Sequence, residues 1–227
     1  IGVIRGEELG VDLAKTIATN ATLRAAHNNG MTFHCVTRAA YRAKTAPAFV
    51  ASLATKFGDF YLIPEGGTNQ LAVKGCEEIL SAEDTRFNYV CAAVGTGGTI
   101  AGLINAAKKH QIVLGFPALK GTFIKNEISP FVTSSKNWDL IYDYHFGGYA
   151  KHNEALISFI NAFKEETNIQ LDPIYTGKML FGIVDLIKKN YFSENSSVLA
   201  IHTGGLQAID GFNRRLAKKN QKLIIDS

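Results

Sequence analysis

Three short segments of the sequence combine glycine with hydroxyl-bearing or acidic residues, and each follows an apolar run. They are residues 65–69 (EGGTN), 95–99 (GTGGT) and 202–205 (HTGG). Glycine has no side chain, so backbone amides can approach a bound anion closely. If the apolar runs are parallel strands, the three segments meet at one sheet edge, where open α/β folds bind ligands. The sequence therefore predicts a ligand site built from these loops.

Segment 95–99 is the most informative of the three, because a helical pattern begins near Thr99 and would add its positive end to the glycine-rich backbone. A phosphate cradle is one interpretation, and a tight strand-to-helix turn is the alternative. A Walker loop needs a lysine after its last glycine, and a dinucleotide fingerprint needs glycine where Ile100 stands. These departures disfavour ATP and NAD. A small ligand with one phosphate, such as pyridoxal phosphate, fits better.

Apolar periodicity alternates between short runs and longer helical patterns, which predicts an α/β fold of three αβα layers with mostly parallel sheets. Strands are expected at 1–5, 31–36, 60–63, 87–94, 111–116, 139–143 and 198–202. Helices are expected at 12–29, 46–57, 70–80, 99–109 and 152–166, from Asp172-Pro173 onward, and after residue 205. The run 87–94 is continuously apolar, so we expect it to be buried on both faces.

Composition and charge exclude several classes of protein. The 227 residues are 46% hydrophobic and 19% charged with a net charge of +4, as in an ordinary globular protein, and they predict no nucleic-acid or membrane partner. Three cysteines at wide spacings favour neither a disulfide framework nor a zinc ribbon, and indicate the reducing cytoplasm. His145 and His152 lie seven apart without a cysteine or carboxylate cluster, so no metal site is expected.

Five segments together carry a family resemblance. They are 63–67 (IPEGG), 94–102 (VGTGGTIAG), 147–149 (GGY), 171–178 (LDPIYTGK) and 201–205 (IHTGG). In order and spacing the chain resembles the D-cysteine desulfhydrase and 1-aminocyclopropane-1-carboxylate deaminase family. These are pyridoxal-phosphate enzymes of the tryptophan synthase β-like fold, known as fold type II. The resemblance implies pyridoxal 5'-phosphate as cofactor and a small amino acid as substrate.

Carried over to this sequence, the resemblance places the cofactor in the glycine loops. The residues implied to hold it are Gly95, Thr96, Gly97, Gly98, Thr99, Thr203 and Gly204. Thr203 would face the pyridine nitrogen, where a neutral hydroxyl leaves the ring less protonated than a carboxylate would. Tyr149 and Tyr175 match tyrosines of the family's substrate pocket, where a phenol can bind the substrate or its leaving group. For Tyr149, packing in the core is an equally weighted alternative.

Thr176 and Thr203 bear on the choice of reaction. The deaminases that this sequence resembles carry Glu and Leu at these positions, whereas the desulfhydrases carry Thr at both. The resemblance therefore implies α,β-elimination of D-cysteine to pyruvate, sulfide and ammonia. Two alternatives stay open: a deaminase that opens the 1-aminocyclopropane-1-carboxylate ring to give 2-oxobutanoate and ammonia, and a module that binds a phosphorylated ligand without chemistry.

The chain departs from the family at its beginning. It opens at Ile1 inside an expected strand, so we expect a fragment: residues 1–63 as the remainder of the small middle domain and 64–227 as the large cofactor-binding domain. Family members hold the lysine that attaches the cofactor, and a Ser-Asn pair for the substrate carboxylate, upstream of this point. Lys120 and Lys178 lie outside that context, and we expect them to be structural or solvated. A homodimer is an open alternative.

Overall fold

The computed structural model describes residues 1–7, 12–133 and 137–225. Contacts within the chain divide it into two compact units, Ile1–Leu62 and Ile63–Ser227. That these units are the remainder of a small domain and a cofactor-binding domain stays a prediction.

The first unit contains a two-stranded parallel sheet, in which Gly2 lies opposite Phe33 and Arg5 opposite Val36. Its strands and helices in the described part are β1 (Gly2–Arg5), α1 (Leu13–Thr19), α2 (Ala21–Asn28), β2 (Phe33–Val36), α3 (Arg38–Arg42) and α4 (Pro47–Phe57). The helix expected at 12–29 is two helices, because the side chain of Asn20 accepts the backbone N–H of Leu23 and so begins α2 anew.

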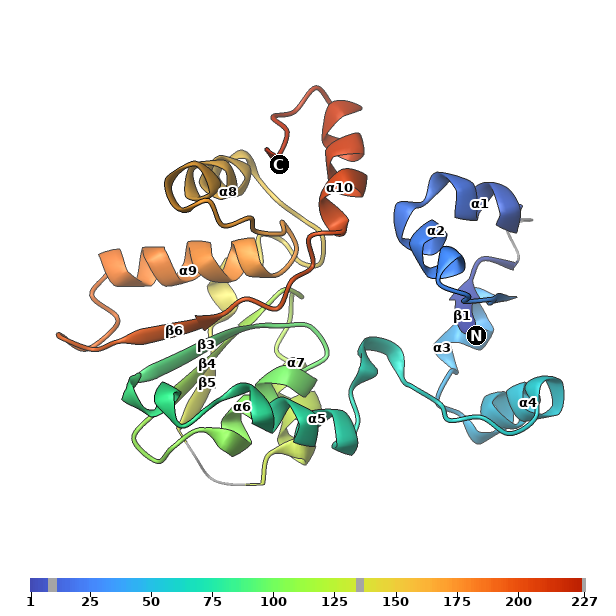
Figure 1. The fold of residues 1–227 in the computed structure, drawn as a ribbon, viewed down its shortest axis with the longest axis horizontal. Helices are drawn as coiled ribbons and strands as arrows, with labels where there is room; N and C mark the ends of the chain where they lie inside the picture. The colour runs from blue at the N-terminus through green and yellow to red at the C-terminus, as the bar shows by residue number, and fades with distance from the viewer. Residues whose placement is uncertain (8–11, 134–136, 226–227) are drawn as a thin grey trace. The chain divides into compact units, whose positions relative to one another are not determined.

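The second unit is built on a four-stranded parallel sheet in the order β5-β4-β3-β6. The strands are β3 (Tyr89–Val94), β4 (Ile112–Pro117), β5 (Trp138–Leu140) and β6 (Val198–Ile201). The helices are α5 (Gln70–Cys76), α6 (Gly98–Ala106), α7 (Ile124–Ile128), α8 (Glu154–Thr167), α9 (Thr176–Lys188) and α10 (Ala208–Ala217). Within this unit, α5, α6 and α7 cover one face of the sheet, and α9 covers the other (Figure 1).

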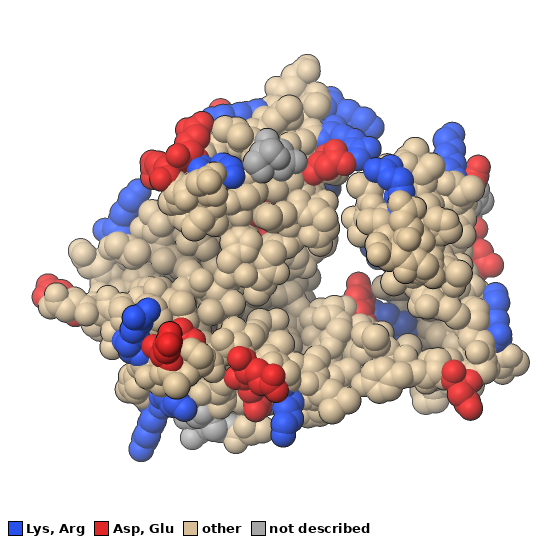
Figure 2. Space-filling view, in the orientation of Figure 1, with Lys and Arg blue, Asp and Glu red and all other residues tan. Residues whose placement is uncertain are grey.

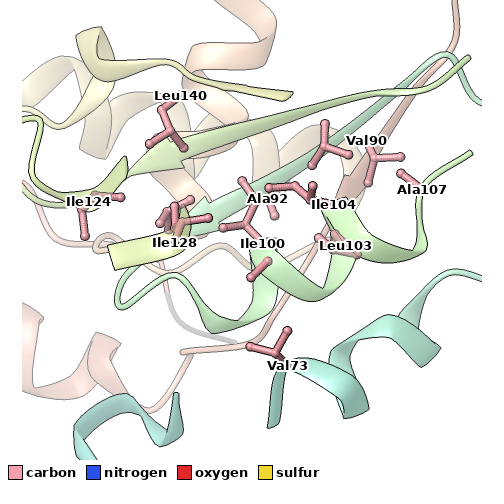
Figure 3. Close-up of a cluster of buried hydrophobic side chains, with 13 residues drawn as sticks. Val73, Val90, Ala92, Ile100, Leu103, Ile104, Ala107, Ile124, Ile128 and Leu140 are labelled. Carbon is pink, nitrogen blue, oxygen red and sulfur yellow. The ribbon is translucent and has the colours of Figure 1, made fainter. Parts of the chain in front are cut away.

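The central strand β3 is buried on both faces, as its apolar run predicts. Val90 and Ala92 pack toward Ile100 and Leu103 of α6 (Figure 3), and Val94 belongs to the same cluster. The alternate residues Tyr89, Cys91 and Ala93 pack toward Met179 and Ile183 of α9. A third apolar cluster joins α8 to α10. The structure thus confirms an α/β fold with parallel sheets whose strands are sandwiched between helices.

The segment 60–63 differs from its expected strand. No ladder among the described residues includes it, and Phe60, Tyr61, Leu62 and Ile63 are each between 40% and 69% exposed. Apolar side chains favour extended backbone, but a strand requires a neighbour with which to form ladder hydrogen bonds. The apolar composition therefore predicted the character of the segment but not its pairing.

Acidic and basic side chains are interspersed on the face shown in Figure 2, in keeping with the small net charge of +4. Across the described ranges, no helix combines the length and apolar character needed to cross a membrane.

Candidate functional site

A cavity of about 340 Å³ lies in the second unit, where the strands β3 and β6 end. It is lined by residues from segments 66–76, 93–100 and 203–207, together with Tyr175. The predicted site residues among its lining are Gly95, Thr96, Gly97, Gly98, Thr99, Tyr175, Thr203 and Gly204. The structure therefore brings the three glycine-rich loops together at one sheet edge, while their role in binding a cofactor stays a prediction.

The loop between β3 and α6 has the geometry of an anion cradle. Gly97 adopts a left-handed backbone with φ 92°, and a Cβ there would lie 2.5 Å from Cγ1 of Ile128. The first amide to bond back into the helix is that of Ala101, which donates to the carbonyl of Gly97 at 3.0 Å. The amides of residues 98–100 precede this ladder, and they lie at the positive end of the helix dipole.

A second glycine loop packs directly against this cradle. The hydroxyls of Thr68 and Thr96 lie 2.6 Å apart in a hydrogen bond. Gly66 has φ 74°, and a Cβ there would lie 2.6 Å from the Thr96 side chain. Sequence reasoning recognised segment 65–69 as part of the sheet edge but did not select Thr68 as a site residue. The sequence feature that could have indicated Thr68 is its place directly after two glycines in a loop of that sheet edge.

Tyr175 contributes a partly buried phenol to the cavity. Its ring packs over Gly95, where an added Cβ would lie 3.4 Å from the phenol oxygen. Burial raises the pKa of Tyr175, and the charge and hydrogen bond of Tyr149 and the carboxylates of Asp172 and Glu65 raise it further. The phenol is therefore protonated near neutral pH and is suited to donate a hydrogen bond rather than to accept a proton.

Tyr149 does not line the cavity, but it contacts a residue that does. Its ring lies 6.1 Å from the ring of Tyr175 at an interplanar angle of 66°, an edge-to-face arrangement. The side chain is 55% exposed, so the alternative of core packing does not describe it. Tyr149 thus lies one contact away from the cavity.

The loop that carries Thr203 and Gly204 is tied back to the chain before α9. The backbone amide of Gly204 donates to Nδ1 of His202 at 3.1 Å, and Nε2 of His202 donates to the carbonyl of Gln170 at 2.8 Å. These bonds hold the loop while Thr203 itself stays exposed at the cavity.

Thr176 differs from its expected position beside the cofactor. It is 0% exposed and does not line the cavity. Its hydroxyl donates to Oδ2 of Asp172 at 2.6 Å, and its backbone amide donates to the same oxygen at 2.7 Å. The reason is local: Asp172 needs donors for a buried carboxylate, and Thr176 begins the helix beside it.

The two lysines considered from sequence also have defined positions. Lys178 is 2% exposed, and its Nζ donates to the carbonyls of His145 at 2.9 Å and Gly148 at 2.8 Å. Burial lowers the pKa of Lys178 to about 8, against the opposing effect of Asp172. Lys178 is therefore structural rather than solvated, whereas Lys120 is exposed. Neither residue lines the cavity.

The thiol of Cys91 and the metal-ligating side chains near the sheet were also considered as candidates. Burial raises the pKa of the Cys91 thiol to about 12, so it remains an unreactive thiol on β3. Within the described ranges, no three His, Cys, Asp or Glu side chains gather in a way that could hold a metal ion.

The fold and site together define an α/β protein with a glycine-rich anion cradle at the carboxyl edge of a parallel sheet. The sequence profile of the family described as "Pyridoxal-phosphate dependent enzyme" matches residues 13–204. The chain belongs to this family.

The chain is also similar to individual curated proteins. It is 33% identical over 169 residues to a putative 1-aminocyclopropane-1-carboxylate deaminase from Pyrococcus abyssi, which covers 66% of this chain and 51% of that protein. It is 26% identical over 180 residues to a D-cysteine desulfhydrase from Serratia proteamaculans, with coverages of 67% and 52%. The chain thus spans about half the length of these relatives.

Among solved structures, that of an ACC deaminase homologue matches with a TM-score of 0.75 and 25% sequence identity, covering 95% of this chain and 69% of that one. The expected fold, that of type II pyridoxal-phosphate enzymes, is confirmed, as is the resemblance to the desulfhydrase and deaminase group.

Proposed function

We propose that the protein is a pyridoxal-phosphate dependent lyase of the D-cysteine desulfhydrase type. The reaction takes D-cysteine and one water to pyruvate, hydrogen sulfide and ammonia. The observation that carries the proposal is a single cavity that joins the cradle at 95–99, the hydroxyl of Thr203 and the phenol of Tyr175 in a chain of this family.

The residues present fit the cofactor. The amides of residues 98–100 and the hydroxyls of Thr96 and Thr99 would hold its phosphate, since the glycines leave the cradle open to an anion. Thr203 would bind the pyridine nitrogen. The bound cofactor supplies an electron sink for the substrate carbon that loses its proton, and a hydroxyl partner leaves that sink weaker than a carboxylate partner would.

Tyr175 would act on the substrate side. Its raised pKa keeps the phenol protonated, so it can donate a hydrogen bond to the substrate or to the departing sulfur. Elimination needs an acid near the leaving group, and a neutral phenol meets that need.

Two positions favour elimination over ring opening. Thr203 lies at the cavity, where the leucine typical of the deaminases would remove the hydroxyl. At Thr176, the glutamate typical of the deaminases would bring a second carboxylate against Asp172, whose oxygen now accepts the threonine hydroxyl. The deaminase reaction remains the second candidate, because the relative from Pyrococcus abyssi carries that name.

The test uses the full-length protein purified with its cofactor. We expect sulfide and pyruvate from D-cysteine, and little 2-oxobutanoate from 1-aminocyclopropane-1-carboxylate. Thr203→Leu should lower sulfide release at least tenfold while the thermal unfolding midpoint stays unchanged, since Thr203 is exposed. Ring opening as the main reaction would establish the deaminase instead, and cofactor binding with neither reaction would establish a binding module.

A further inference from the structure

The loop before Tyr149 has an unusual backbone. Its φ angles are 54° at Phe146, 94° at Gly147, 118° at Gly148 and 54° at Ala150. Two of these residues are not glycine, and a positive φ is unfavourable for a bulky residue such as Phe146. A backbone of this kind persists only where its surroundings hold it, and such segments concentrate at functional sites.

Lys178 of α9 supplies that hold. Its ammonium binds the carbonyl of His145, directly before the strained stretch, and that of Gly148 within it. Each carbonyl also accepts a backbone amide, from Gly148 and Lys151 respectively, so the lysine completes a network rather than replacing one. Phe146 adds an edge-to-face contact with Phe181, at 5.0 Å between ring centroids.

Burying this ammonium has a cost. Desolvation lowers the pKa of Lys178, and a buried charge is in general a weak source of stability. An apolar side chain of similar length would fill the same volume without that penalty. The burial of this lysine is thus better explained by the carbonyls that its N–H donors hold than by a gain in stability.

The carbonyl of Gly148, which Lys178 binds, is next in sequence to a residue that contacts the cavity lining. Gly148 precedes Tyr149, whose exposed side chain makes its ring contact with Tyr175. The backbone of Tyr175 is fixed separately, since its amide donates to Oδ1 of Asp172 at 2.8 Å. The Tyr175 ring contacts both Gly95 and the ring of Tyr149, and Tyr149 is the contact that belongs to the strained loop.

We propose that Lys178 is a positioning residue of the site: by fixing the carbonyls of His145 and Gly148, it places Tyr149 against Tyr175 and so sets the direction of the Tyr175 phenol. The proposal rests on the proposed lyase function for its kinetic consequence. Its structural consequence, the contact between the two rings, can be measured without any turnover.

The test compares Lys178→Met with the matched control Lys188→Met, whose lysine is exposed on the same helix. Both are made in the full-length, cofactor-loaded protein labelled with 3-fluorotyrosine. The fluorine resonances of the two rings are assigned with Tyr149→Phe and Tyr175→Phe. We expect Lys178→Met to shift both resonances and Lys188→Met to shift neither. Unchanged resonances in Lys178→Met would overturn the proposal, whether or not the protein is a lyase.

Kinetics give the second readout. We expect Lys178→Met to lower kcat for sulfide release at least tenfold, with cofactor affinity within twofold of the original because the cradle at 95–99 is untouched. In a Tyr149→Ala background the same change should have little further effect, since the two act through one contact. Additive losses would show a general structural role and would contradict the proposal.

A second variant tests the proposal even if Lys178→Met does not fold. Gly148→Ala adds a Cβ that meets only ordinary contacts, at 3.5 Å from Lys120, but disfavours φ 118°. It moves the same carbonyl without touching the lysine, so it should shift the same two resonances. If it leaves both unchanged, the loop does not position Tyr149.

Discussion

At Gly97 two requirements coincide, a left-handed backbone and a neighbour that leaves no room for a side chain. The neighbour is Ile128 of α7, which packs beneath the cradle in the apolar cluster of Figure 3. A side chain at this position would distort the loop whose amides we propose to bind the phosphate. The effect should therefore appear in ligand binding before it appears in the reaction.

We predict that Gly97→Val weakens cofactor binding tenfold or more in the full-length protein, a loss of about 1.4 kcal/mol. The strain at φ 92° and the overlap with Ile128 act together here. Gly75→Val is the control, because a Cβ at Gly75 meets no atom within 4 Å. Absorbance titration with pyridoxal phosphate measures both affinities. Equal affinities in the two variants would show that the loop at 95–99 does not bind the cofactor.

At the scale of residues, sequence predicted positions better than orientations. The glycine clusters were informative because close approach and left-handed backbone restrict the choice of residue to glycine. Thr176 does not line the cavity because its hydroxyl and amide bind Asp172, four residues earlier in the sequence, whose buried carboxylate needs donors. Residue type alone does not indicate this choice of partner. The burial of Lys178 depends instead on tertiary neighbours, since the carbonyls it binds are about thirty residues away in the sequence.

At the scale of elements, the beginning of α9 shows what capping patterns can predict. Asp172-Pro173 indicates a helix start, yet the helix begins at Thr176. The carboxylate of Asp172 accepts the amides of Ile174, Tyr175 and Thr176, so the expected capping chemistry is present but occupies a turn before the helix. Side-chain capping was recognisable from residue types, while its offset depended on the backbone path into the helix.

The buried lysine of α9 makes the free energy of unfolding depend on pH. Lys178 has a pKa of about 8 in the folded chain against an ordinary value of 10.5, so the folded state binds fewer protons between these values. The contribution of Lys178 to the free energy of unfolding must therefore rise with pH across that window, by about 3 kcal/mol, and be lowest below pH 8. A neutral amine keeps two donors, enough for both carbonyls.

We predict that the difference in unfolding free energy between the original chain and Lys178→Met changes in favour of the original chain as pH rises from 7 to 10. Urea unfolding of both proteins at several pH values measures this difference, and groups common to both cancel. A difference that is constant with pH would show that Lys178 does not titrate in this range. Lys188→Met should show the same change of unfolding free energy with pH as the original chain.

At the scale of the whole molecule, the parallel sheet explains why segments distant in sequence form one site. Strands β3 and β6 are adjacent in the sheet although about a hundred residues separate them, so the loops at 95–99 and 203–205 meet at its edge. The βαβ pattern made that meeting predictable from sequence. Among the described residues that line the cavity there is no lysine, and a covalent link to the cofactor would need a lysine amine there.

We predict that the 227-residue chain, mixed with pyridoxal phosphate and reduced with borohydride, carries no stoichiometric adduct at a single lysine and forms no pyruvate from D-cysteine. A covalent link needs an amine that reaches the cofactor aldehyde. The amine of Lys178 is already bound to two carbonyls, and Lys120 does not line the cavity. Peptide mapping by mass spectrometry should find only scattered, partial modification, unchanged in Lys178→Met. One full adduct at Lys178 or Lys120, accompanied by pyruvate, would show that this chain contains its own catalytic lysine.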